Sequence, residues 1–145
     1  MDIRILTAAE LDEAISLAKE VILSEIDVSW SKEAAKSISE FMAERLKQFT
    51  VYGLYEEGLE SILAYDPEKM HIILLLTKQT SRKKGYATAL LNHLKEEADK
   101  NRLSKITANV VDSAADFYHR YGFEDAGTST EAGGMNYTPM EYLVG

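Results

Sequence analysis

The sequence predicts a single-domain α/β (α+β) protein whose strands and helices follow the order β-α-α-β-β-β-α-β-α-β-β. A chain of 145 residues suits one hydrophobic core. Hydrophobic residues make up 46% and charged residues 28%, which is typical of an ordinary globular protein. Apolar residues recur at helical spacing in some stretches and in short strand-like runs in others. We therefore expect one domain over residues 1–145.

The N-terminus predicts a short strand followed by a helix. Residues 3–5 alternate apolar and polar side chains as a strand does. Thr7 stands three residues before Glu10, which is the capping-box pattern of a helix start. The apolar residues that follow lie on one stripe, so a helix is expected over about residues 8–24.

A second helix and three strands are expected next. Ser31 is a suitable cap for a helix through about residue 49, forming a hairpin with the first helix. Residues 51–55 and 59–65 predict two strands joined by a glycine turn. Residues 70–76 form a continuous apolar run that predicts a central strand.

The C-terminal part alternates helices and strands. A long amphipathic helix ending near residue 101 is expected before a strand at 105–111. A short aromatic helix follows, and Gly122 suits a left-handed turn at its end. A last hairpin is expected around residues 133–134, with Pro139 at an edge position or a bulge.

Composition excludes several kinds of chemistry and partner. With no cysteine, the chain cannot form a disulfide, a thiolate metal site or a thiol nucleophile. Its three histidines lack the paired spacing of a zinc-binding helix, so no metal is expected. The net charge of −8 argues against nucleic-acid binding and mildly favours cationic small molecules. A polar N-terminus and the lack of a long apolar run predict a cytoplasmic protein without a membrane partner.

A basic loop lies where the long helix begins. Arg82, Lys83 and Lys84 are placed where the positive end of the helix dipole disfavours cations. An anion would resolve that conflict, and Gly85 would let it approach the backbone N–H groups closely. The loop is therefore either an anion cradle suited to phosphate or a solvated basic turn, and charge alone favours the turn.

The motif Arg82-x-x-Gly85-x-Ala87, after a strand at 71–77, resembles the acetyl-CoA signature Q/R-x-x-G-x-G/A of the GNAT superfamily of N-acetyltransferases. The order of elements is similar to that fold along essentially the whole chain. The resemblance implies a mixed, mostly antiparallel central sheet flanked by helices. It also implies acetyl-CoA as co-substrate, with no metal.

The resemblance further implies which residues hold the cofactor. Backbone N–H groups of the loop and helix start would bind the pyrophosphate, and the central strand would separate from its neighbour after Leu75. That separation would leave a backbone amide to stabilise the developing oxyanion. The implied cofactor-binding residues are Leu75, Thr77, Arg82, Lys83, Lys84, Gly85, Tyr86, Ala87 and Thr88.

The segment 114–123 is similar to the second GNAT signature, A-x-x-F/L-Y-x-x-x-G-F. Tyr118 falls on the tyrosine that protonates the departing thiolate in that family. Phenol and thiol have comparable acidity, with pKa values of roughly 10 and 8.5. Periodicity alone favours a plain aromatic face for Tyr118. Val111 departs from the family pattern, because an asparagine often stands seven residues before the tyrosine.

The reaction also needs a base, because an amine attacks only in its neutral form. By resemblance, His71 matches the position of the catalytic glutamate in the histone-acetyltransferase branch, and imidazole has a suitable pKa of roughly 6.5. An equally good interpretation is a strand-edge histidine without a role. Glu68 and Asp66 are alternative bases.

The acceptor pocket is the least specific part of the prediction. Asp27 and Trp30 lie between the two N-terminal helices, where the GNAT fold usually lines this pocket. Trp30 is slightly better interpreted as a core anchor. Tyr137 belongs to a stretch that is either the other pocket wall or an exposed hairpin tip.

These patterns together favour direct acetyl transfer from acetyl-CoA to a primary amine of a small molecule or peptide. No serine or cysteine constellation supports a covalent enzyme intermediate. The alternative is a coenzyme-A-binding sensor or interaction module without turnover. The sequence leaves the acceptor and a homodimeric assembly open.

Overall fold

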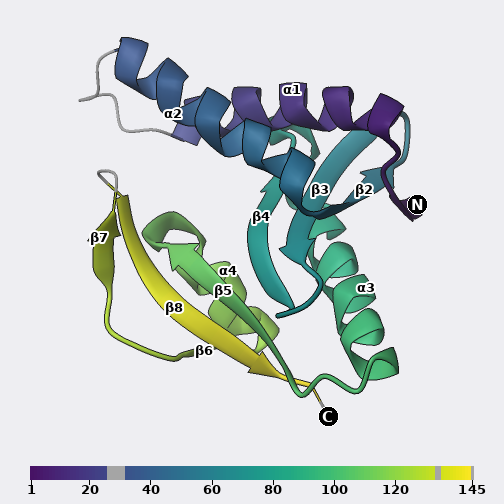
Figure 1. Cartoon of the computed structure of the whole chain (residues 1–145), viewed down its shortest axis with the longest axis vertical. Helices are drawn as coiled ribbons and strands as arrows, with labels where there is room; N and C mark the ends of the chain where they lie inside the picture. The colour runs from purple at the N-terminus through teal and green to yellow at the C-terminus, as the bar shows by residue number, and fades with distance from the viewer. Residues whose placement is uncertain (26–31, 133–134, 145) are drawn as a thin grey trace. The chain divides into compact units, whose positions relative to one another are not determined.

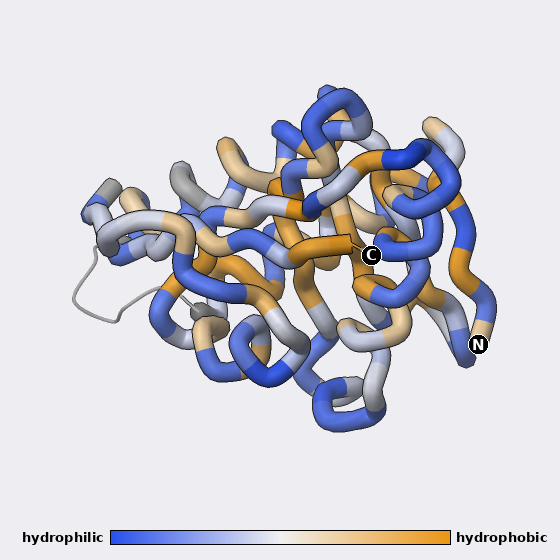
Figure 2. The backbone as a smooth tube through the Cα atoms, turned by 90° about the horizontal axis from the view of Figure 1, so that it is seen from below, coloured by the Kyte–Doolittle hydropathy of each residue, from blue (hydrophilic) through white to orange (hydrophobic). Residues whose placement is uncertain are grey.

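The computed structural model describes residues 1–25, 32–132 and 135–144, and their elements follow the predicted order with one extra strand near the C-terminus (Figure 1). The helices and strands are β1 (Asp2–Ile5), α1 (Ala8–Glu25), α2 (Lys32–Glu44), β2 (Thr50–Tyr55), β3 (Leu59–Asp66), β4 (His71–Thr77), α3 (Tyr86–Lys100), β5 (Lys105–Val111), α4 (Ala115–Tyr121), β6 (Glu124–Asp125), β7 (Thr130–Ala132) and β8 (Met135–Leu143). Short 3₁₀ helices are η1 (Arg45–Gln48), η2 (Gln79–Ser81) and η3 (Asp112–Ala114). Figure 2 shows that hydrophobic and hydrophilic stretches alternate along the backbone.

The strands form a mixed sheet in the hydrogen-bonded order β1-β2-β3-β4-β5-β8-β6, with β7 paired to β8. β4 and β5 are parallel, whereas the β1–β2, β5–β8, β6–β8 and β7–β8 pairs are antiparallel. Contacts divide the chain into two compact units. The first holds Met1–Ala64 and Leu74–Leu90, and the second holds Tyr65–Ile73 and Leu91–Gly145. β4 and α3 therefore contribute residues to both units.

In the first unit, the capping box predicted for α1 is present. The Thr7 N–H donates to Glu10 Oε1 at 3.1 Å, and the Glu10 N–H donates to Thr7 Oγ1 at 3.4 Å. α1 and α2 lie side by side (Figure 1). The second helix is α-helical only to Glu44, which is shorter than predicted, because the chain tightens into η1 around the fully buried Leu46.

The strand buried along its length is β3 rather than β4. Residues 59–65 of β3 are all buried, including Glu60 and Ser61. In β4 the buried residues are Ile72 and Leu74, and the others are half-buried. β4 nonetheless has the central place predicted for it, between β3 and β5.

In the second unit, β5 and β8 form a long antiparallel ladder that runs from Lys105–Leu143 to Val111–Tyr137 (Figure 1). Pro139 of β8 lies opposite Asn109 of β5, and its carbonyl accepts the Ala126 N–H at 2.7 Å. On that side of β8, residues 140–141 pair with β6 and residues 135–137 pair with β7, so Pro139 lies between the two ladders. This gap is a local edge, where a missing N–H donor does no harm.

The turns of the second unit follow the glycine signals. Gly122 has φ 124° and ends α4, and its N–H donates to the carbonyls of Tyr118 and His119. The predicted last hairpin is formed by β7 and β8, whose pairs reach Ala132–Met135. Gly133 and Gly134 lie outside the described residues. β6 is the strand that was not predicted.

Candidate active site

The loop after β4 is anchored by a buried carboxylate in the first unit. Glu60 of β3 is 9% exposed, and its Oε2 accepts the Ser81 hydroxyl at 2.7 Å. The Glu60 carbonyl accepts the Lys78 N–H at 2.9 Å, and the Lys78 carbonyl accepts the Ser81 N–H at the same distance. Glu60 therefore fixes both ends of η2, just before the basic cluster.

The end of β4 is held by a second polar residue of β3. Ser61 Oγ lies 2.8 Å from the Leu76 carbonyl and 2.9 Å from Thr77 Oγ1. Because Ser61 has one proton and donates it to the carbonyl, the Thr77 hydroxyl donates to Ser61. Arg82 Nε lies 3.4 Å from the Thr77 carbonyl, which turns this guanidinium back toward the strand end.

The backbone after Arg82 is the candidate anion cradle. Lys83 has φ 65° and Gly85 has φ 80°, so two of three consecutive residues are left-handed. α3 starts at Tyr86, and its first loop-to-helix bond joins the Ala89 N–H to the Gly85 carbonyl at 3.0 Å. The N–H groups before Ala89 have no acceptor within the helix, as at every helix start. Left-handed residues followed by a helix N-terminus form a concavity that favours phosphate.

The surroundings of Gly85 sharpen the reason for a glycine there. A Cβ atom built on Gly85 would meet nothing within 4 Å, so space alone does not require glycine. Its positive φ does, because L side chains disfavour that conformation. The same open space allows an anion to approach the backbone. Arg82, Lys83, Lys84 and Thr88 are exposed around it, whereas Leu75, Tyr86 and Ala87 are half-buried.

An acidic turn lies near one side chain of the loop. The pKa of the Tyr86 hydroxyl is raised by partial desolvation and by Glu56, Glu60 and Glu57. The phenol is thus kept protonated, and it remains a hydrogen-bond donor at neutral pH.

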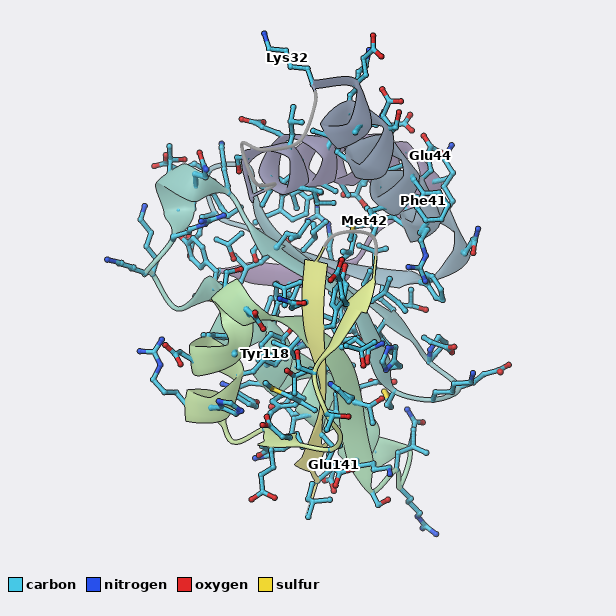
Figure 3. The ribbon with its side chains drawn as sticks, turned by 90° about the vertical axis from the view of Figure 1, so that its left-hand side faces the viewer. Lys32, Phe41, Met42, Glu44, Tyr118 and Glu141 are labelled. Atoms are coloured by element: carbon cyan, nitrogen blue, oxygen red, sulfur yellow. The ribbon has the colours of Figure 1, made fainter. Side chains whose placement is uncertain are left out.

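In the second unit, Tyr118 lies buried in α4 within a cluster of aromatic rings, and Figure 3 labels it on that helix. Its ring makes edge contacts with Phe117 at 5.7 Å and Phe123 at 5.0 Å between centroids. Burial raises the pKa of its hydroxyl above the ordinary value. Tyr118 therefore belongs to an aromatic face, as periodicity suggests, and carries a phenol that stays protonated.

The neighbouring Tyr121 has a clear structural partner. Its hydroxyl donates to Asn92 Oδ1 of α3 at 2.7 Å. Burial, with a smaller effect of Tyr142, raises the pKa of Tyr121 to about 12. This bond ties α4 to the part of α3 that lies in the second unit.

His71 opens β4 and has a defined partner on β5. Its Nδ1 lies 2.7 Å from Thr107 Oγ1. The two residues are register partners, and the β4–β5 register consists of this pair and Ile72–Ala108. The alternative bases lie before β4: Asp66 ends β3, Glu68 follows in the turn, and Asp66 Oδ1 accepts the Glu68 N–H at 3.0 Å.

The predicted acceptor residues are only partly covered. Asp27 and Trp30 lie outside the described residues. Tyr137 is half-buried in β8 and pairs with Val111 on one side and Thr130 on the other. The position where the family often has asparagine thus lies directly across from the predicted substrate-binding tyrosine.

The pair of His119 and Asp125 lies on the surface. His119 Nε2 lies 2.7 Å from Asp125 Oδ1 in an exposed pair. Within residues 1–25, 32–132 and 135–144, no group of three or more His, Asp or Glu side chains is arranged to hold a metal ion. The helices of that same part of the chain include none with the length and apolarity to cross a membrane.

Sequence reasoning missed three residues that shape these sites: Glu60, Ser81 and Thr107. Glu60 gave a usable signal, because a carboxylate inside the apolar run 59–65 must be paired when the strand is buried. Ser81 and Thr107 gave none, because their partners are 21 and 36 residues away in sequence.

Comparisons with known proteins agree with the fold described above. Residues 13–144 match the model of the acetyltransferase (GNAT) domain family. No curated protein matches the chain at a significant level. Many solved structures share its fold.

The first is a GCN5-related N-acetyltransferase from Rhodopseudomonas palustris, with TM-score 0.78 and 17% identity over 98% of this chain and 94% of that one. The second is the PaiA N-acetyltransferase of Thermoplasma acidophilum in complex with coenzyme A, with TM-score 0.75 and 17% identity over 99% of both chains. Tetrahymena GCN5 is similar with TM-score 0.74 and 15% identity over 100% of this chain and 97% of that one. The chain belongs to the GNAT family of acetyl-CoA-dependent N-acetyltransferases.

Proposed function

We propose that this enzyme moves the acetyl group of acetyl-CoA directly to a primary amine of a small molecule or peptide. The observation that carries the proposal is the loop before α3, where Lys83 and Gly85 are left-handed and three cations surround the helix start. A pyrophosphate has the charge and the acceptor oxygens that such a loop binds.

The residues of the loop fit the cofactor in chemistry and in space. Backbone N–H groups of residues 83–88 would hold the pyrophosphate, with Lys83 and Lys84 adding charge. The open space beside Gly85 allows the close approach that these bonds need. Leu75 and Thr77 would bind through the backbone of β4, which precedes the loop. Acetyl-CoA supplies an activated acyl group as its thioester.

Tyr118 is proposed as the donor to the leaving thiolate. As the amine nitrogen bonds to the acyl carbon and the C–S bond breaks, sulfur gains negative charge that an O–H donor stabilises. Burial keeps the Tyr118 phenol protonated, so the donor form is present at any physiological pH. The same burial disfavours the phenolate, so we expect hydrogen-bond donation to contribute more than complete proton transfer.

His71 is proposed as the base that takes the proton from the ammonium form of the acceptor. A cationic amine must lose that proton before it attacks, and imidazole titrates in the right range. The net charge of −8 draws cationic acceptors toward the protein. Tyr137, Asp27 and Trp30 are proposed to contact the acceptor.

The test is release of free thiol from acetyl-CoA with a panel of polyamines, amino acids, aminoglycosides and peptides. Tyr118→Phe should lower kcat by about a hundredfold while leaving acetyl-CoA affinity nearly unchanged. Tyr121→Phe is the matched control, because it removes a hydroxyl from the same helix whose bond goes to Asn92. Binding of coenzyme A without thiol release from any acceptor would contradict turnover and support a sensor. A Tyr118→Phe rate equal to wild type would remove Tyr118 from the mechanism.

A further inference from the structure

Glu60 is the only carboxylate that is buried in the part of the chain that the structure describes. It lies in β3, where all the residues from 59 to 65 are buried. A charged group is unfavourable in such a place unless it is paired. Glu60 has no part in the proposed transfer of the acetyl group, so its presence in the core points to another role.

Two hydrogen bonds join Glu60 to the connection between β4 and α3. Its Oε2 accepts the Ser81 hydroxyl at 2.7 Å, and its carbonyl accepts the Lys78 N–H at 2.9 Å. Ser81 is 3% exposed, although residues 78–80 and 82–85 on either side of it are exposed. Ser81 is therefore the point at which this surface segment is held to the core, and Glu60 holds it there. All of these residues belong to the first unit.

The segment after Ser81 has a strained backbone. Lys83 has φ 65°, a left-handed conformation that is unfavourable for a residue with a long side chain. Strain of this kind persists only where the surrounding structure fixes the backbone. The start of α3 at Tyr86 fixes the segment on one side, and the bond between Ser81 and Glu60 fixes it on the other.

We propose that Glu60 is a positioning residue that keeps the cofactor loop, residues 82–85, in its binding conformation by holding Ser81. The inference rests on the proposed function, in which this loop binds the pyrophosphate of acetyl-CoA. Without the bond, the loop takes several conformations in the free enzyme, and the cofactor must order it on binding at the expense of affinity. Glu60 thus acts on affinity for the pyrophosphate-bearing part of the cofactor and not on the transfer step.

The central variant is Ser81→Ala, which removes the bond and leaves Glu60 in place. Ser39→Ala is the matched control, because Ser39 is a 2%-exposed serine of the first unit whose hydroxyl donates to the Lys36 carbonyl in α2. Glu60→Ala removes the acceptor, whereas Glu60→Gln keeps an acceptor oxygen for the Ser81 hydroxyl. Urea unfolding identifies the folded variants, and Ser81→Ala still decides the matter if Glu60→Ala does not fold.

The first measurement is calorimetric binding of coenzyme A, which requires no turnover. Ser81→Ala and Glu60→Ala should each weaken binding by about tenfold, which corresponds to ordering about one residue of backbone. The double variant should bind as either single variant does, because all three lack the same bond. Ser39→Ala should bind as wild type does, and Glu60→Gln should bind more tightly than Glu60→Ala. Wild-type affinity in Ser81→Ala, an equal loss in Ser39→Ala or additive losses in the double variant would overturn the proposal.

The second measurement compares acetyl-CoA with S-acetylpantetheine, which carries the same thioester but no pyrophosphate or nucleotide. Ser81→Ala should raise the KM for acetyl-CoA by about tenfold with kcat near wild type, and it should leave kcat/KM for S-acetylpantetheine unchanged. Equal losses with the two thioesters would assign the effect to the fold as a whole and overturn the proposal. Absence of thiol release from wild type would refute acetyl transfer alone, because the calorimetric comparison would still decide the role of Glu60.

Discussion

Replacing Gly85 by alanine isolates the left-handed backbone of the basic loop. The residue has φ 80°, and an added Cβ atom meets nothing within 4 Å. The substitution therefore introduces no clash, and its effect on folding comes from backbone strain. At this position, backbone strain can therefore be measured without a steric clash.

The expected magnitude follows from two opposing effects. An L residue in the left-handed region loses roughly 1–2 kcal/mol relative to glycine. Alanine also restricts the unfolded chain, which stabilises the protein by roughly 0.4–1 kcal/mol. The free energy of unfolding of Gly85→Ala should therefore fall by about 0–1.6 kcal/mol, with a central value of about 0.8 kcal/mol.

Gly58 provides the matched control. It lies in the β2–β3 turn, it also has nothing within 4 Å of its Cβ position, and it has no positive φ. Gly58→Ala should be neutral or stabilise by roughly 0.4–1 kcal/mol. Urea unfolding of both variants gives the comparison, and equal free energies of unfolding would refute the strain argument.

Coenzyme A binding is the second readout of the same pair. A methyl group at Gly85 occupies the space through which an anion reaches the N–H groups of the helix start, so titration calorimetry should show weaker binding. Gly58→Ala should bind as wild type does. If both variants bind coenzyme A with wild-type affinity, the cradle is not the pyrophosphate site.

Three further outcomes are expected. Glu60→Ala leaves the buried Ser81 hydroxyl without its acceptor, so the free energy of unfolding should fall by about 1–3 kcal/mol and the KM for acetyl-CoA should rise. Urea unfolding and steady-state kinetics measure the two effects, and both should be smaller in Glu60→Gln. The hydrogen bond from Arg4 holds the pKa of Glu10 below its ordinary value. Ionised Glu10 therefore stabilises the fold at pH values above its unfolded pKa, and this stabilisation is lost as the pH falls through the folded pKa. In Glu10→Gln, the free energy of unfolding should depend less on pH on the acid side. Tyr121→Phe should lower the free energy of unfolding by about 1 kcal/mol, because it removes the hydroxyl that donates to Asn92. Since burial raises the pKa of Tyr121, an ultraviolet titration of this variant should lose a phenol of raised pKa and keep the phenols that titrate in the ordinary range.

Local signals in the sequence predicted the ends of several elements correctly. The capping box of Thr7 and Glu10 starts α1 at Ala8, and Gly122 ends α4 in a left-handed turn. Both signals act within four residues, where the chain's own geometry decides the outcome. The order of elements could be predicted for the same reason, since each helix or strand carries its own periodicity.

Contacts between distant segments could not be predicted in this way. The Glu60–Ser81 and His71–Thr107 bonds depend on which strand lies beside which and in what register. A shift of one residue in register would move every side chain to the other face. Likewise, the change from α2 to η1 depends on the tertiary packing of Leu46, so helix periodicity overestimated the length of α2.

The burial of Tyr118 bears on the pH dependence that its proposed role predicts. An ordinary phenol has a pKa of roughly 10 and an ordinary thiol a pKa of roughly 8.5, so the two are similar acids in water. Burial raises the pKa of the Tyr118 hydroxyl above its ordinary value, so we expect the phenol to stay protonated near neutral pH. We therefore expect an alkaline limb in the kcat profile to come from another group. Tyr118→Phe should lower the plateau of that profile and leave both limbs in place, whereas loss of the alkaline limb in this variant would show that the tyrosine ionises and would refute the burial argument.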